Sequence, residues 1–194
     1  MSIALAQAFQ FDGTMRQKDI VGEWVPMDEP GPLSDTISGN EKWVRGIRFE
    51  EIDQNLILRH VTSKRQKAIE VNLRLAPMVM DELHRLSYLP SAGPVIVREY
   101  DGKPWRSGEF CRQWRKVARA AGVPDAVFNM DSRSGGITEA TDAGAELEHV
   151  RHMATHGDIA MTQRYSRGSI EKVAKVMEMR VAHRNKPGSG EPGK

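Results

Sequence analysis

Residues 156–165 read HGDIAMTQRY, and this stretch decides how the rest of the chain is interpreted. A histidine, His156, lies nine positions before a tyrosine, Tyr165, and the segment ends in the pattern Thr-x-x-Tyr. Three shorter segments precede it. They are Met130-Asp131-Ser132-Arg133, Ser63-Lys64, and Gly13-Thr14-Met15-Arg16-Gln17-Lys18-Asp19. In chain order the segments supply an arginine, a lysine, a second arginine, a histidine and a tyrosine.

That series resembles the catalytic domain of the tyrosine recombinases, the phage integrase family. The resemblance runs from about Ile3 to Val181, which is nearly the whole chain. None of the segments is specific alone, although the spacing from histidine to Thr-x-x-Tyr is fairly distinctive. Five elements in the family's order are more specific, because independent chance matches multiply.

The resemblance implies a role for each of the five residues in cleaving a DNA phosphodiester. Arg16 and Arg133 would hold the phosphate, whose negative charge repels nucleophiles, because guanidiniums stay charged and present paired donors. Tyr165 would attack phosphorus and form a 3′-phosphotyrosyl link; its ordinary pKa of about 10 means that it needs cationic surroundings. His156 would hydrogen-bond the phosphate, and Lys64 would protonate the leaving 5′-oxygen.

Three neighbouring residues would support these five. Asp19 matches an acidic family position one helical turn after Arg16, and we expect it to orient its surroundings. The family's second box is usually His-x-x-Arg, whereas Met130 stands at its first position here. A thioether cannot donate a hydrogen bond to phosphate. Asn129 would offer an amide donor only if the local backbone shifted.

Charge is segregated along the chain although the net charge is only +2, from 28 Lys and Arg against 26 Asp and Glu. Residues 12–53 are acidic. Three later stretches are basic, which is typical of a surface for a polyanion, although solvated helix faces would look the same. The basic residues expected to bind DNA are Arg65, Lys67, Arg164 and Arg167. Lys67 is also the alternative to Lys64 as proton donor.

The pattern of apolar residues predicts an α+β fold, mainly helical with a small antiparallel sheet, and the resemblance adds the architecture of the recombinase catalytic domain. A strand-like segment is expected to begin at Val44, another strand is expected at 56–61, and alternating residues predict a strand at 68–73, with a basic turn at 62–67 between the last two. Residues 26–42 are expected to form an acidic loop rich in Pro and Gly. Helices are expected at 1–12, 15–24, 77–89, 107–121, 134–142, 146–153 and 159–165, with an amphipathic helix over 170–181.

We expect one domain at 1–184 and a disordered tail at 185–194. The N-terminal core-binding domain that usually clamps the other side of the duplex in this family has no counterpart here. Trp105 and Trp114 are expected to anchor the core. No apolar run approaches the roughly 20 residues that cross a bilayer, and no signal peptide is apparent. The expected location is therefore cytoplasmic, without membrane contact.

A metal site is the less favoured alternative. His149, His152 and His156 are spaced so that one helix face would carry all three, but Thr155 and Gly157 predict that the helix ends first. The single cysteine, Cys111, cannot build a thiolate-rich site. We therefore expect no metal ligands and no cofactor, since a phosphotyrosine link conserves the bond energy.

The expected partner is double-stranded DNA. The resemblance implies a homotetramer on DNA for the full-length protein, and the isolated domain is expected to be a monomer. Two functions from different classes stay open: an active DNA strand transferase, and a DNA-binding or assembly module that has lost its chemistry. A metal hydrolase is a distant third.

Overall fold

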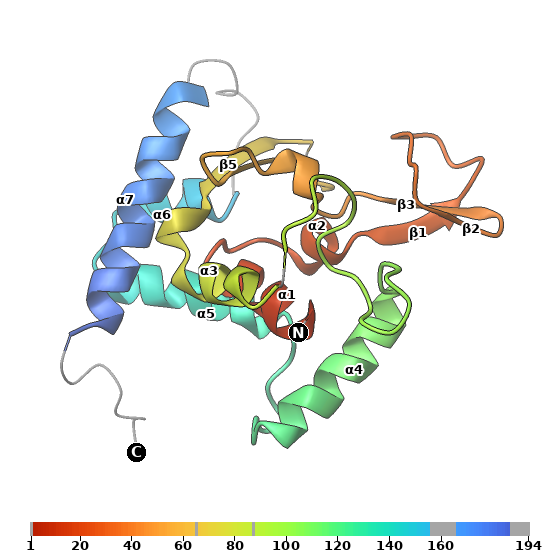
Figure 1. Ribbon diagram of the computed structural model, residues 1–194. Helices are drawn as coiled ribbons and strands as arrows, with labels where there is room; N and C mark the ends of the chain where they lie inside the picture. Colours follow the sequence, from red (N-terminus) through yellow and green to blue (C-terminus); the bar gives the residue numbers. More distant parts are fainter. Residues whose placement is uncertain (1, 65, 87, 156–165, 187–194) are drawn as a thin grey trace.

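The computed structural model describes residues 2–64, 66–86, 88–155 and 166–186. The fold is mixed α+β with small antiparallel sheets, as predicted. Figure 1 shows the helices gathered around α1, with the strands above and to one side. The elements in order are α1 (Ser2–Phe11), α2 (Gln17–Val21), β1 (Glu23–Pro26), β2 (Ile37–Ser38), β3 (Glu41–Val44), η1 (Phe49–Glu51), β4 (Ile57–Val61), β5 (Ala68–Asn72), η2 (Leu73–Leu75), α3 (Pro77–His84), α4 (Ser107–Ala120), α5 (Asp131–Asp142), α6 (Leu147–Met153) and α7 (Ser166–Arg184).

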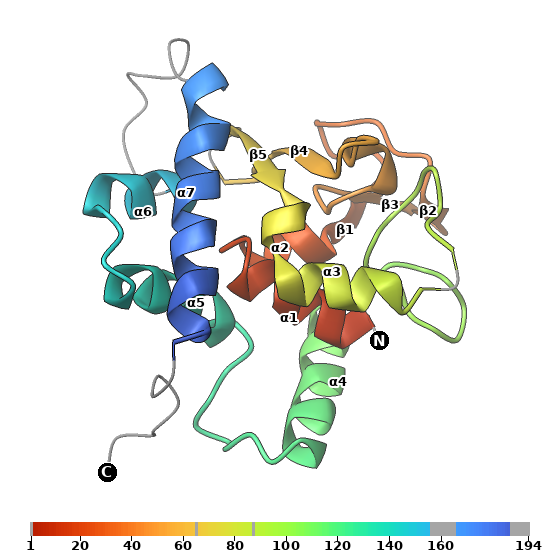
Figure 2. The same ribbon diagram turned by 60° about the vertical axis from the view of Figure 1, so that its left-hand side comes forward.

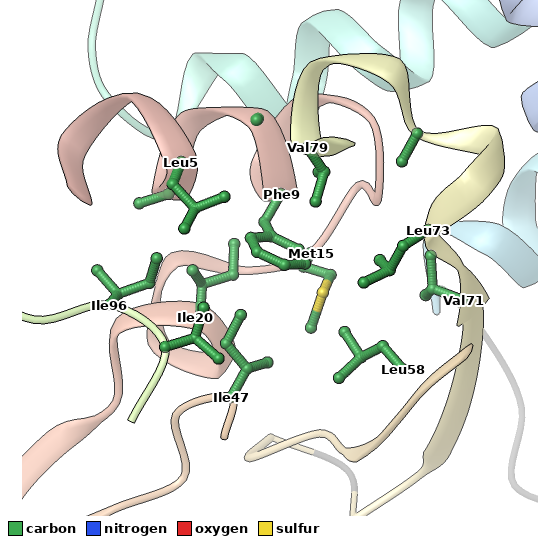
Figure 3. Packing of buried hydrophobic residues seen from close by; sticks show 14 of the residues in the cluster. Leu5, Phe9, Met15, Ile20, Ile47, Leu58, Val71, Leu73, Val79 and Ile96 are labelled. Carbon is green, nitrogen blue, oxygen red and sulfur yellow. The ribbon is translucent and has the colours of Figure 1, made fainter. Parts of the chain in front are cut away.

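Helix α1 forms the centre of the core and is buried on nearly every side, as expected for a helix that other elements surround. It packs against α2, α3, α4 and α5. In Figure 3, Phe9 and Met15 project into the middle of the apolar cluster, among side chains such as Val79 of α3 and Leu58 of β4. The segment that follows α1, which carries Arg16, is therefore held on a rigid base.

A buried network of charged groups fastens α7 to the end of α1. Arg180 is 1% exposed and donates to the carbonyl oxygens of Phe11 and Asp12 at 2.6 and 2.7 Å. Glu139 of α5 accepts from both Arg180 and Arg184, at 2.8 and 2.7 Å. Arg184 also reaches the Asp12 carboxylate at 2.7 Å. Figure 2 shows α7 running past α5 and α6 up to β5, so this network ties the two ends of the domain together.

The predicted hairpin is confirmed. Strands β4 and β5 pair antiparallel, with Ile57 opposite Asn72 and Val61 opposite Ala68. The amide of Thr62 donates to the carbonyl of Lys67 at 2.9 Å and closes the turn. Residues 62–67 therefore form a hairpin tip beyond the paired strands. β5 also packs against α7.

The prediction for residues 15–44 is partly wrong, because a three-stranded sheet occupies much of this region. The strand order is β1-β3-β2, so the expected acidic loop 26–42 contains β2 and the start of β3. The expected helix 15–24 is only five residues long, α2, and ends at Gly22, whose φ is +73°. A Cβ at Gly22 would lie 2.4 Å from the indole of Trp43, which is 1% exposed. The buried Trp43 side chain thus sets where the helix ends and β1 begins.

The remaining helices lie close to their expected ranges. α4 matches within one residue, whereas α3 ends five residues early, at His84, and α5 begins three residues early, at Asp131. Trp105 and Trp114 are buried, as predicted. Residues 185 and 186, which were expected to be disordered, donate their amides to carbonyls of α7. The expected helix 159–165 and residues 187–194 lie outside the described residues. No helix in the described part of the chain is long and apolar enough to span a bilayer.

Candidate functional site

The C-terminal end of α6 is the point where the predicted site residues meet. Three successive residues there accept hydrogen bonds from side chains of two segments that are distant in sequence. One segment begins at Thr14 and the other is α5. The donors are Thr14 Oγ1 to Met153 O at 3.2 Å, Arg133 Nη2 to Ala154 O, and Arg16 Nη1 to Thr155 Oγ1 at 2.9 Å. Since the last carbonyls of a helix carry partial negative charge, they are suited to hold cationic side chains. The structure thus brings Arg133 to Ala154 and Arg16 to Thr155, the two residues that precede His156.

Arg16 stands at the N-terminus of α2 with an extended backbone, φ −77° and ψ 146°. Its Nη1 lies 3.7 Å from Oδ2 of Asp19, one helical turn later. The Asp19 side chain is 1% exposed and that of Arg16 is 21% exposed. The Arg16 side chain is therefore partly open to solvent, while its ion-pair partner, the Asp19 carboxylate, is buried.

Asp19 also connects this arginine to the hairpin tip. Its Oδ1 accepts the amide of Ser63 at 2.7 Å, across 44 residues of sequence. Lys64 is the next residue and is exposed. Lys67 is partly buried at the other side of the tip, with its amide and carbonyl both bonded to Thr62. One carboxylate thus contacts both Arg16 and the amide of the residue before Lys64.

Arg133 lies in the first turn of α5 and is partly buried. Burial and the neighbouring charge of Arg16 lower the pKa of Arg133 to about 10, while Asp19 opposes that shift. Arg133 therefore stays charged at neutral pH. Two guanidiniums that repel each other, with one carboxylate between them, carry a net positive charge that suits an anionic ligand.

Asn129 does not supply the free amide that would replace the missing histidine. It is 6% exposed, and its Oδ1 accepts from Gln7 and, at 2.8 Å, from Gln10. Its Nδ2 donates to Oε1 of Gln17, the residue after Arg16. Met130 is 68% exposed at the start of α5. Asn129 thus joins α1 to α2 and is not oriented toward a ligand.

Two threonines in this site have a left-handed backbone conformation that residues other than glycine rarely adopt. Thr14 has φ +47° and Thr155 has φ +54°, and both are buried. A branched Cβ in the left-handed region is uncommon and costs about 1–3 kcal/mol. We did not anticipate Thr14, Thr155 or Gln17 from the sequence. The only sequence signal for Thr155 was its position just after a helix that was expected to end there.

Several predicted residues lie outside the description. His156, Arg164 and Tyr165 belong to 156–165, Arg65 is likewise not described, and Arg167 lies in the part of α7 whose side chains are not described. His149 lies 3.7 Å from Glu146, in a surface pair. Within the described ranges no three His, Cys, Asp or Glu side chains gather as metal ligands would.

A separate open hollow of about 930 Å³ lies between residues 31–35 and β4. Its arginines are paired with carboxylates: Arg45 with Glu23, and Arg48 with Asp35 at 2.7 Å. His60 faces Glu51 at 3.0 Å on its floor. The arginines of this hollow are therefore already neutralised.

No known protein family, curated protein or solved structure matches the chain.

Proposed function

We propose that this chain is the catalytic domain of a tyrosine-type DNA recombinase, acting on double-stranded DNA. The supporting observation is that Arg16 and Arg133 bond the two residues that follow α6, Thr155 and Ala154 respectively, while Asp19 links Arg16 to the hairpin tip. These residues come from three segments far apart in the sequence. A site that concentrates two partly buried guanidiniums next to an exposed lysine is suited to a phosphodiester.

The proposed reaction assigns one step to each group. Tyr165 loses its phenolic proton to water and its oxygen attacks phosphorus, and the bond from phosphorus to the 5′-oxygen breaks as the new bond forms. Arg16 and Arg133 bind the non-bridging oxygens, whose negative charge grows in the transition state. Lys64 transfers a proton to the 5′-oxygen, and His156 hydrogen-bonds the phosphate. A 5′-hydroxyl from another strand reverses the step and completes strand exchange, in an assembly of four copies on DNA.

The surroundings of Met130 favour one alternative, a DNA-binding or assembly module with impaired chemistry. Met130 is exposed, and the amide of Asn129 is already bonded to Gln17. The Met130 thioether cannot donate the hydrogen bond that the family places on phosphate, and the Asn129 amide is buried and engaged with Gln17. Losing one such donor would slow cleavage by about 10²–10³-fold without removing the nucleophile.

A covalent capture assay distinguishes the two functions. The chain is incubated with a pool of randomised duplexes that carry a nick, so that cleavage releases a short strand and traps the protein on DNA. After denaturation in detergent, the active enzyme leaves a protein–DNA adduct, and its DNA is sequenced to identify the target. Tyr165→Phe must lose the adduct, while Tyr88→Phe, at a tyrosine that is 72% exposed, must keep it. Absence of any adduct from the unaltered chain would contradict the proposed activity and favour the binding module.

A further inference from the structure

Thr155 stands at a position where the backbone favours glycine. α6 ends at Met153, Ala154 follows as its last helical neighbour, and Thr155 then turns to φ +54°. Helices commonly end with a left-handed residue at this place, and glycine adopts it without a steric penalty. A threonine there is strained by its branched Cβ. Thr155 is also 6% exposed, so the strain is not explained by a need for a polar surface residue.

The hydroxyl of Thr155 has a specific partner. Its Oγ1 accepts from Nη1 of Arg16 at 2.9 Å, across 139 residues of sequence. The opposite segment repeats the arrangement: Thr14, at φ +47°, donates to the carbonyl of Met153 at 3.2 Å. Each strained threonine thus bonds the segment that carries the other. Strain that persists at a buried site indicates that the surrounding contacts require it.

We propose that Thr155 is a positioning residue that holds the Arg16 guanidinium beside Arg133, and that the strained backbone is kept for the sake of this hydroxyl. Thr155 takes one of the five N–H donors of the guanidinium, so the others can still face a phosphate. The catalytic consequence rests on the proposed function, whereas the positioning of Arg16 is a property of the folded chain alone.

Three substitutions separate the hydroxyl from the strain. Thr155→Val keeps the branched shape and the strain but removes the acceptor. Thr155→Ser keeps the acceptor and removes the branch. Thr155→Gly removes the acceptor and relieves the backbone. If Thr155 serves the fold alone, Gly should be tolerated at least as well as Ser.

The first measurement needs no activity. Nitrogen-15 NMR of the arginine side chains follows the Arg16 guanidinium, identified by the signal that disappears in Arg16→Lys. We expect slowed guanidinium rotation in the unaltered chain and in Thr155→Ser. We expect rotation like that of exposed arginines in Thr155→Val and Thr155→Gly. The same Arg16 signal in all four proteins would overturn the proposal.

The second measurement is the single-turnover rate of adduct formation, compared with DNA affinity and melting temperature. Thr155→Val and Thr155→Gly should slow the rate about tenfold or more, since each loses a hydrogen bond to a charged group. Thr155→Ser should stay within about threefold of the unaltered chain, and DNA affinity should change little in all three. A Thr155→Gly protein as fast as the unaltered chain would overturn the proposal. If the unaltered chain forms no adduct, the proposed function fails, and the NMR result alone decides the role of Thr155.

Discussion

At the scale of single residues, Asp19 connects more of the site than any motif indicates. Its carboxylate lies 3.7 Å from Nη1 of Arg16 and accepts the amide of Ser63 at 2.7 Å. Arg133 is affected by the charges of both Arg16 and Asp19. One buried carboxylate therefore offsets the repulsion between two arginines and also fixes the hairpin tip. Its two tasks, charge and hydrogen-bond acceptance, can be separated by substitution.

Asp19→Ala should lower the free energy of unfolding by about 3 kcal/mol, because it leaves the two cations uncompensated and the Ser63 amide unbonded. Asp19→Asn should cost about 1–2 kcal/mol less, since its carbonyl still accepts that amide. Urea denaturation of both variants measures the difference. Added sulfate should restore part of the stability lost in either variant, because it neutralises the arginines. Equal losses for Ala and Asn would show that the amide bond contributes nothing.

Arg133 provides a test based on pH. Its pKa is lowered to about 10 by burial and by Arg16, so the folded state holds its proton less tightly than the unfolded chain does. The charge therefore opposes folding at every pH below about 10, and the penalty declines as the pH rises through 10.

Arg133→Met should raise the free energy of unfolding by about 1 kcal/mol or more at pH 7, while it abolishes adduct formation. The gain should shrink above pH 10. Denaturation at pH 7, 9 and 10.5 tests the sign, and a gain that grows with pH would contradict it. Arg85→Met, at a 66% exposed side chain, is the matched control and should change stability little at any pH.

The individual site residues were predictable to different degrees. Arg16, Asp19 and Arg133 were chosen because the order of their motifs resembles the tyrosine recombinases, and the structure brings these three side chains close together. The roles of Thr14, Thr155 and Gln17 depend on partners more than 100 residues away, such as Asn129 for Gln17 and Arg16 for Thr155. A local sequence pattern carries no information about such partners.

At the scale of elements, the packing of α5 on the end of α1 depends on a small residue. Gly136 is buried, and a Cβ built there would lie 2.2 Å from the carbonyl oxygen of Phe11 and 2.8 Å from Nη2 of Arg180. At the neighbouring Gly135 the nearest contact would be 3.3 Å, to the Phe11 ring. The glycine at 136 thus lets α5 approach the carbonyl that Arg180 also binds.

Gly136→Ala should lower the free energy of unfolding by about 2–3 kcal/mol, because the backbone of residue 11 must move and the Arg180 bonds with it. Gly135→Ala is the matched control. It should change stability by less than about 1 kcal/mol, since a modest clash is offset by the better helix propensity of alanine. Thermal unfolding of both variants measures this, and an equally stable Gly136→Ala protein would contradict the proposed close contact.

The elements themselves were predictable where the pattern is local. In the β4–β5 hairpin, β5 alternates apolar and polar residues and a polar turn precedes it, and α4 has a clear apolar stripe, so both were placed within a residue or two. Strand β1 was missed, and β3 was expected to begin only at Val44, where it ends. Their pairing depends on Trp43, which packs over Gly22 and donates to the Val21 carbonyl at 3.0 Å. This contact joins segments about 20 residues apart. It favours strands in a region whose Pro- and Gly-rich composition predicts a loop.

At the scale of the whole molecule, pairing reduces the charge segregation that the sequence displays. Several arginines between residues 98 and 119 face carboxylates close by in space. These pairs are Arg98 with Asp101 and Glu109, Arg106 with Glu41, and Arg119 with Asp125. Exposed pairs of this kind leave little net charge to attract a polyanion. The attraction must then come from the cations that carboxylates do not neutralise, including Lys64 on the hairpin tip beside the Arg16–Arg133 pair.

This reasoning predicts which lysine and arginine positions govern the salt dependence of DNA binding. Affinity for a 30-base-pair duplex, measured by fluorescence anisotropy between 50 and 300 mM salt, should fall steeply as salt rises, because bound phosphates release counterions. Lys64→Ala should reduce the slope of log affinity against log salt by about 1, as expected for one lost phosphate contact. Arg85→Ala removes the same charge at the end of α3, from a side chain paired with Glu82, and should leave the slope unchanged. Equal slopes for the two variants would show that DNA binds by overall charge, and that the hairpin tip does not face the duplex.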